Sequence, residues 1–168
     1  MKLHCTLLAA ALVLASSQTA ASEPNPLDRG LLPVPANRIV GFWHAKVSIG
    51  PCAGGPVNTF LGLNTFMAGG TLSDTNTFQP TSRGPGMGVW TYLGRGTRGA
   101  SRYKNHFQFA RFKPDGSFDG LQDVYNDITL QADGRTWTAN VHAYVLNVDG
   151  SVRMEACGSA LADRVTIN

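Results

Sequence analysis

The sequence predicts an all-β protein, an eight-stranded antiparallel up-and-down barrel. Three Asp-Gly pairs, at positions 115–116, 133–134 and 149–150, separate long segments in which apolar and polar residues alternate. Asp-Gly supplies the positive φ angles of tight hairpins, so each pair marks a turn between antiparallel strands. No stretch is a credible helix, and the connections are short. Eight such strands close most simply into a barrel that pairs the first strand with the last and leaves no exposed edge; a two-sheet sandwich is the alternative.

Residues 1–22 have the layout of a secretory signal peptide. Lys2 gives a basic start, an apolar run covers positions 7–15, and small residues follow as far as Ser22. The apolar run is shorter than the about 20 residues that a membrane span requires, and no later stretch comes closer. We therefore expect a soluble protein that is secreted or periplasmic and has no membrane span.

The remaining chain divides into a leader and one barrel domain. Residues 23–38 contain four prolines and form an extended leader, because proline is excluded from helix interiors. Residues 39–168 have the length of a single domain with one core. Its first strand spans positions 39–49, and we place Trp43 on the inner row.

Positions 57–67 and 71–78 form the next hairpin. Placing Ala68 opposite Thr71 puts an inner row on each strand, with Leu61, Leu63, Thr65 and Met67 facing Leu72, Asp74, Asn76 and Phe78. Positions 79–86 then form a flexible loop that is long enough to act as a lid. A strand over positions 88–93 follows, with Trp90 and Tyr92 on one face.

The Asp-Gly turns fix the pairing of the last four strands. The second turn aligns Leu130 with Trp137, and the third aligns Val145 with Met154. Across the longer first turn, placing Phe112 opposite Ser117 aligns four inner pairs, namely Phe109 with Gly120, Phe107 with Gln122, Asn105 with Val124 and Tyr103 with Asn126. On the outer face the same register places Arg102 opposite Asp127 and His106 opposite Asp123.

Two cysteines, Cys52 and Cys157, remain once the signal peptide is removed. Thiols oxidise in an exported protein, so we predict a disulfide between them. By the chain-entropy model a loop of this length stabilises the fold by about 4 to 5 kcal/mol. The alternatives are two unpaired thiols or an intermolecular bridge. No second Cys or His lies at ligand spacing along the sequence, which disfavours a metal-binding role.

Charge and motif content exclude several classes of function. The 14 basic and 11 acidic residues are interspersed, giving a net charge of +3, and no basic run carries interleaved aromatic residues, which disfavours nucleic-acid binding. His44, His106 and His142 fall on outward positions, so we expect no metal site and no histidine-activated nucleophile. No glycine-rich loop lies between a strand and a helix to hold phosphate, and we expect no cofactor.

The tripeptide Gly41-Phe42-Trp43 resembles the Gly-x-Trp signature of lipocalins and of the broader calycin group. In that group a basic residue near the end of the last strand covers the tryptophan, and Arg164 is similarly placed. The second half, with Gly88-Val89-Trp90 and the Asp-Gly turns, resembles small secreted bacterial barrels with no established function. Allene-oxide-cyclase-like barrels are similar in shape. The resemblance implies a calycin-like barrel that binds a small hydrophobic ligand.

The inner face is rich in aromatic residues, and its polar members are amides and one phenol. Such groups orient a ligand but are poor general acids or bases near neutral pH. We therefore expect a ligand-binding lumen contacted by Trp43, Trp90, Tyr103, Asn105, Phe107, Gln122, Asn126 and Trp137. One wall consists of alanine and glycine, which predicts partial filling by tryptophans from across the barrel and a cavity toward the end that carries loop 79–86.

Two other functions fit the same pattern. An enzyme of the cyclase or isomerase kind would fold a flexible substrate with little acid-base chemistry, and its candidate catalytic residues are Asp74 and Tyr103. It requires Asp74 to face inward with a raised pKa. A structural or protein-inhibitory barrel would bind through its loops around a packed core. An empty interior below about 100 Å³ would favour this third function, since ligand pockets usually need about 300 Å³ or more.

Overall fold

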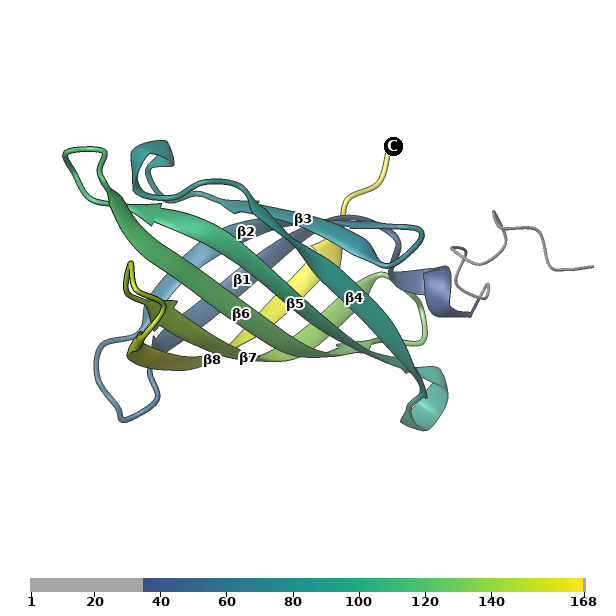
Figure 1. Ribbon diagram of the computed structural model, residues 1–168. Helices are drawn as coiled ribbons and strands as arrows, with labels where there is room; N and C mark the ends of the chain where they lie inside the picture. The colour runs from purple at the N-terminus through teal and green to yellow at the C-terminus, as the bar shows by residue number, and fades with distance from the viewer. Residues whose placement is uncertain (1–34, 168) are drawn as a thin grey trace, which may run out of the picture.

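The computed structural model describes residues 35–167, which form a closed barrel of eight antiparallel strands (Figure 1). Each strand pairs with the next in sequence, and the first pairs with the last, which confirms the predicted fold and excludes the sandwich. The strands are β1 Gly41–Pro51, β2 Asn58–Met67, β3 Thr71–Asn76, β4 Gly86–Arg95, β5 Ser101–Phe112, β6 Phe118–Leu130, β7 Thr136–Leu146 and β8 Val152–Arg164. Three short 3-10 turns accompany them, η2 Ala36–Ile39, η3 Pro80–Ser82 and η4 Thr97–Gly99.

The predicted signal peptide and most of the leader lie outside the described residues. Within residues 35–167 no helix has the length and apolar character that a membrane crossing demands. The end of the leader differs from the extended chain that we predicted, because positions 36–39 form η2 and β1 starts at Gly41 instead of Ile39.

The two ends of the barrel differ. The connections β1–β2, β3–β4, β5–β6 and β7–β8 gather at the end drawn on the left of Figure 1, which we call the open end. The other end, which we call the closed end, carries η2, η4 and the turns β2–β3 and β6–β7. Side chains that are essentially inaccessible to solvent fill the closed end, namely Ile39, Trp43, Tyr103 and Leu130.

The turn η2 seals the closed end because its polar groups find partners on several strands. The Trp43 indole donates a hydrogen bond to the Ile39 carbonyl at 2.9 Å. Arg38 donates to the carbonyl of Gly99, in η4, and to the carbonyls of Gln131 and Ala132, beside the β6–β7 turn. The leader is therefore fixed to the barrel at its last residues by the burial of Ile39 and by the Arg38 hydrogen bonds.

Arg164 covers Trp43, as the Gly-x-Trp resemblance implied. Its guanidinium carbon lies 4.2 Å from the centre of the Trp43 ring, and it donates to the carbonyls of Val40 and Gly134 at 2.7 and 2.8 Å. Gly41 permits this approach, since its φ is +139° and a Cβ there would stand 2.6 Å from the Arg164 guanidinium. A side chain at position 41 would displace Arg164 from the tryptophan.

The pairing of the last three strands agrees with the prediction from the Asp-Gly turns. Leu130 pairs with Trp137, and Val145 pairs with Met154. The predicted β5–β6 pairing is wrong by two residues: the observed pairs are Phe109 with Gln122, Phe107 with Val124, Asn105 with Asn126 and Tyr103 with Ile128.

The two-residue shift between β5 and β6 arises in two steps. The turn closes with Lys113 opposite Ser117, one residue later than we predicted, and Phe112 pairs with Phe118. A bulge then inserts Asp119, so that Arg111 pairs with Gly120, whose φ is +102°. Because the total shift is even, the inner and outer faces stay as predicted. On the outer face Lys104, not Arg102, pairs with Asp127.

The predicted inner row of β2 is wrong. Phe60, Asn64 and Phe66 point inward, whereas Leu61 and Met67 are exposed. Both rows of β2 contain large apolar residues, so alternation alone does not choose between them. The inner row of β3 is as predicted, with Leu72 and Asp74 buried.

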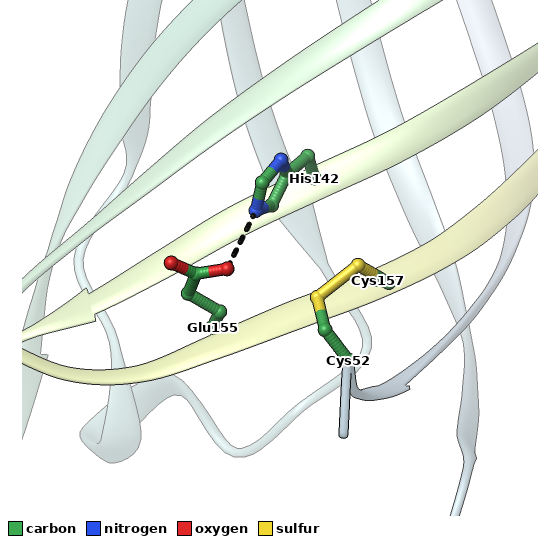
Figure 2. Close-up of a disulfide and its surroundings, with 4 residues drawn as sticks. All are labelled: Cys52, His142, Glu155 and Cys157. Atoms are coloured by element: carbon green, nitrogen blue, oxygen red, sulfur yellow. Dashed lines mark ion pairs between the residues drawn. A yellow bond between two sulfur atoms is a disulfide. The ribbon is translucent and has the colours of Figure 1, made fainter. Parts of the chain in front are cut away.

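The predicted disulfide is present. Cys52 directly follows β1 and Cys157 lies on β8, 105 residues later in the sequence (Figure 2). The bond therefore joins the two strands that close the barrel, toward the open end. His142 lies beside it on β7, with its Nε2 atom 3.5 Å from a carboxylate oxygen of Glu155.

Candidate ligand cavity at the open end

A cavity of about 850 Å³ occupies the interior of the barrel toward the open end. Strands β1, β2, β5, β7 and β8 contribute apolar side chains to it, including Val47, Ile49, Phe60, Phe107, Phe109, Val141, Val145, Ala156 and Ala160. Loop residues Phe78 and Ser82 lie at its rim. The volume falls in the range of about 300 to 1,000 Å³ that is usual for small-molecule sites.

The cavity exists because one wall is small. Ala139 and Ala162 lie toward the closed end, where Trp43 and Trp137 pack with their ring centres 6.2 Å apart. Ala156 and Ala160 lie nearer the open end of the barrel, and no large side chain from the opposite wall fills the space beside them. The tryptophans therefore fill one half of the barrel and leave the other half hollow.

The residues predicted to contact a ligand separate into two groups. Phe107, Gln122, Asn126 and Trp137 line the cavity. The other four, Trp43, Trp90, Tyr103 and Asn105, are buried outside its lining.

Hydrogen bonds to neighbouring groups hold Trp90 and Asn105 in place, as the Ile39 carbonyl does for Trp43. The Trp90 indole donates to the carbonyls of Met67 and Thr71. Asn105 accepts a hydrogen bond from Asn126 at 2.8 Å. The packed half of the barrel thus supports the floor of the cavity.

An ion pair between Asp74 and Arg83 is buried in the cavity wall. Arg83 Nη2 lies 2.6 Å from Asp74 Oδ1, and Asn64 donates to the other carboxylate oxygen at 2.8 Å. Arg83 comes from the β3–β4 loop and folds inward over the ring of Phe109, with 3.7 Å between the guanidinium carbon and the ring centre. Only 7% of Asp74 and 9% of Arg83 is exposed.

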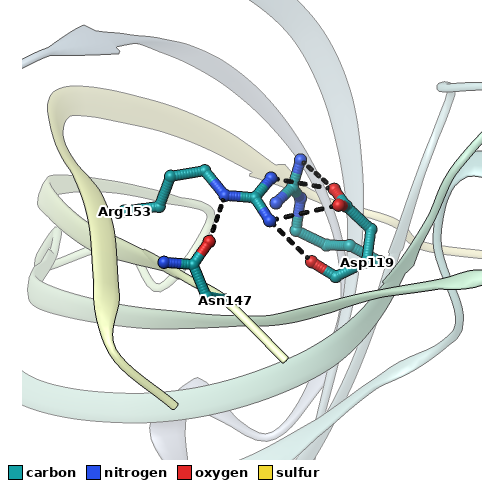
Figure 3. A network of polar contacts seen from close by, with 4 residues as sticks. Asp119, Asn147 and Arg153 are labelled. Carbon is teal, nitrogen blue, oxygen red and sulfur yellow. Dashed lines mark hydrogen bonds and ion pairs between the residues drawn. The ribbon is translucent and has the colours of Figure 1, made fainter. Parts of the chain in front are cut away.

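A second charged cluster lies at the rim of the cavity, around Asp119 (Figure 3). Arg153 donates to both carboxylate oxygens of Asp119, at 3.0 and 3.1 Å, and to the side-chain oxygen of Asn147 at 2.7 Å. Arg111 approaches the same carboxylate from β5, with Nη2 at 3.1 Å from Oδ2. Three arginines, Arg83, Arg111 and Arg153, therefore line the cavity, and we call them the mouth arginines.

The mouth arginines were not predicted from the sequence. Arg83 is the only charged residue of the predicted 79–86 loop, and an inward Asp74 on the preceding strand requires a buried cation. These two observations together could have placed Arg83 inside. Arg111 falls on the predicted inner row of its strand, whereas Arg153 is the extra residue of a bulge in β8, between the pairs Val145–Met154 and Leu146–Val152.

The carboxyl groups of Asp74 and Asp119 are expected to titrate on opposite sides of the ordinary aspartate pKa of 3.8. Burial raises the pKa of Asp74, and Arg83 and Asn64 offset only part of that shift. The hydrogen bonds from Arg153 lower the pKa of Asp119. By linkage, the stability gained from protonation of Asp74 is full below about pH 3.8 and is lost as the pH rises through its folded pKa, whereas the stability gained from ionisation of Asp119 is lost as the pH falls through its folded pKa. Side-chain ¹³C NMR titration measures both pKa values. A titration midpoint of Asp74 below that of Asp119 would contradict the expected directions of the two shifts.

The histidines stay on the outer surface, as the alternation predicted. His106 stacks on Tyr125 with 4.2 Å between ring centres, and its Nε2 atom is 3.9 Å from Asp123. His142 lies opposite Cys157, and the ligand atoms of His142, Cys52 and Cys157 fall within 4.8 Å of one another. Sequence spacing did not indicate this cluster, which forms across the β7–β8 pair. Its sulfur atoms are joined in the disulfide, so they offer no thiolate to a metal ion.

Comparisons with protein-family models, with curated proteins and with solved structures find no match to this chain. The closed antiparallel barrel is consistent with the calycin-like architecture that the Gly-x-Trp resemblance implied. A functional assignment therefore depends on the cavity and its side chains.

Proposed function

We propose that the protein is a secreted or periplasmic binding protein that holds a small, largely hydrophobic molecule inside the barrel. The observation that carries this proposal is the 850 Å³ cavity, whose walls are mainly aliphatic and aromatic and which lies toward the loops of the open end. Burial of an apolar ligand there would gain about 25 cal/mol for each Å² removed from water. A barrel that acts only through its loops needs no such hollow.

Export is supported by two independent features. The signal-peptide pattern over residues 1–22 directs a chain out of the cytoplasm. The Cys52–Cys157 disulfide is compatible with an oxidising compartment. A protein that carries a hydrophobic molecule through an aqueous compartment has to enclose it, and the closed wall of the barrel serves that purpose.

Filling the cavity is expected to abolish binding of a neutral apolar probe. Ala160 lies on the small wall of β8 and lines the cavity, whereas its neighbour Ser159 faces solvent. We expect 1-N-phenylnaphthylamine to bind the unmodified protein with a rise in its fluorescence. Ala160→Trp should weaken this binding by about tenfold or more, because the indole occupies the ligand volume.

Ser159→Trp is the matched control, since it adds the same side chain one residue away on the outer face. It should bind the probe as the unmodified protein does. No probe binding by the unmodified protein, or equal binding by both tryptophan variants, would refute a ligand site in the cavity. If the probe binds as expected, organic extraction of protein purified from its own host, followed by mass spectrometry, would identify the natural ligand.

An enzyme of the cyclase or isomerase kind is the second candidate, and Asp74 is the observation that favours it. Asp74 lines the cavity, and burial raises its pKa, which are the conditions that such a mechanism requires. Both of its oxygens are engaged, by Arg83 and Asn64, and Tyr103 lies outside the cavity lining with a pKa that burial raises above 10.0. Chemical conversion of the extracted molecule by the unmodified protein but not by Asp74→Asn would favour the enzyme.

A further inference from the structure

The charges at the cavity do not balance. Three guanidinium groups, those of the mouth arginines, line it, while within residues 35–167 the carboxylates that pair with them are those of Asp74 and Asp119. Arg83 and Asp74 neutralise each other in a buried contact. Arg111 and Arg153 share Asp119, which leaves one positive charge without a matching carboxylate at the open end.

The unmatched charge belongs to Arg111. Arg153 already binds both oxygens of Asp119 and also donates to Asn147, so its nitrogen atoms are engaged. Arg111 contacts Asp119 through Nη2, and its Nη1 atom is shielded from solvent yet has no hydrogen-bond partner in the described part of the chain. A guanidinium nitrogen that is neither hydrated nor hydrogen-bonded costs free energy, which an additional acceptor would recover.

The position of Arg111 relative to the cavity indicates what that acceptor belongs to. Arg111 is the last inward residue of β5 that pairs with β6, directly beyond Phe107 and Phe109 on the same row. A molecule held with its apolar body along Phe107, Val141 and Ala160 would therefore reach Arg111 with the end nearest the loops.

We propose that the ligand is an amphipathic carboxylic acid whose carboxylate binds Arg111 at the open end while its apolar chain fills the cavity. This inference rests on the proposed function, because it concerns the same cavity. A carboxylate matches the planar guanidinium and can accept two parallel hydrogen bonds from it. Arg111 would turn Nη1 toward the ligand, and Arg153, which binds both carboxylate oxygens of Asp119, would keep that carboxylate neutralised.

The test compares dodecanoate with its methyl ester, which has the same chain but a neutral head group that carries one additional methyl. Both are titrated against bound 1-N-phenylnaphthylamine at neutral pH, below the concentration at which dodecanoate forms micelles. We expect the unmodified protein to bind dodecanoate about tenfold or more tightly than the ester, as a charge-assisted hydrogen bond provides. Arg111→Gln should remove that preference by weakening dodecanoate alone.

Arg102→Gln is the matched control, because Arg102 lies on the same strand and points outward into solvent. It should leave both affinities unchanged. Arg111→Lys keeps the charge without the planar pair of donors and should keep part of the preference, which also covers the case of an Arg111→Gln variant that fails to fold.

The outcomes separate this inference from the proposed function. Equal binding of dodecanoate and ester by the unmodified protein, or a preference that survives in Arg111→Gln, would overturn the role of Arg111 and leave a neutral ligand in the cavity. Failure of both molecules and of the probe to bind would overturn the cavity as a ligand site altogether.

Discussion

Removal of the Cys52–Cys157 disulfide is expected to lower the free energy of unfolding by about 4 to 5 kcal/mol. The bond closes a loop of 105 residues, so it restricts the unfolded chain strongly. It also joins β1 to β8, the pair that closes the barrel, at the end where the cavity lies. The experiment is urea unfolding of the Cys52→Ser/Cys157→Ser double variant, followed by tryptophan fluorescence.

Chemical reduction of the unmodified protein is the control for this prediction. The unmodified protein unfolded in the presence of a strong thiol reductant should show the same stability as the double variant, because both lack the same bond. Loss of less than about 1 kcal/mol would show that the paired β1 and β8 strands alone hold the barrel closed. The double variant should also bind 1-N-phenylnaphthylamine more weakly, since the wall of the cavity would open along this seam.

Replacement of Asp74 by alanine is expected to cost about 3 to 5 kcal/mol of unfolding free energy. The variant leaves the Arg83 guanidinium buried without a counterion, 9% exposed and packed on Phe109. Desolvation of an unpaired charge is costly, whereas the intact pair offsets much of that cost. Chemical unfolding at neutral pH measures the effect.

The control for this prediction is Asp127→Ala. Asp127 pairs with Lys104 at 3.4 Å, but both side chains are about 60% exposed, so the change should stay below about 1 kcal/mol. The double variant Asp74→Leu/Arg83→Met removes both charges and should recover most of the loss. If Asp74→Ala is no more harmful than Asp127→Ala, Arg83 is able to leave the barrel for solvent, and the loop that carries it is not fixed in the wall.

The second half of the barrel was predictable because its signals are local. Each Asp-Gly turn sets a hairpin, and a one-residue error would have buried a row that includes Lys104, Asp123 and His142. The β5–β6 pairing shows the limit of this reasoning. A two-residue error keeps every side chain on its predicted face, so the alternation carries no information that would detect the bulge at Asp119.

The first half was less predictable because β2 has apolar residues on both faces. Counting Leu61, Leu63 and Met67 favoured the wrong row. The correct row contains Asn64, which is polar in sequence but is required inside as the hydrogen-bond partner of Asp74. A buried carboxylate on β3 therefore determines the orientation of its neighbour, and this dependence becomes visible only once the strands are paired.

The candidate site was predicted in outline and missed in detail. The small wall of β8 predicted a cavity and its location near loop 79–86, and Phe107, Gln122, Asn126 and Trp137 do line it. Asp74 was predicted to face inward, but the mouth arginines were missed. Arg83 reaches the wall from a loop, and Arg153 is the extra residue of a bulge in β8 that no turn motif marks. It meets Asp119, which lies 34 residues earlier in the sequence.

The seal formed by η2 has a practical consequence for how the molecule can be tethered. Both ends of the described chain, at η2 and just beyond β8, leave the barrel on the side opposite to the loops around the mouth arginines (Figure 1). A fusion partner, a resin or a sensor surface attached just beyond β8 would thus sit behind the barrel, with the open end facing the solution. Protein immobilised in this way should accordingly bind 1-N-phenylnaphthylamine as well as protein in solution does.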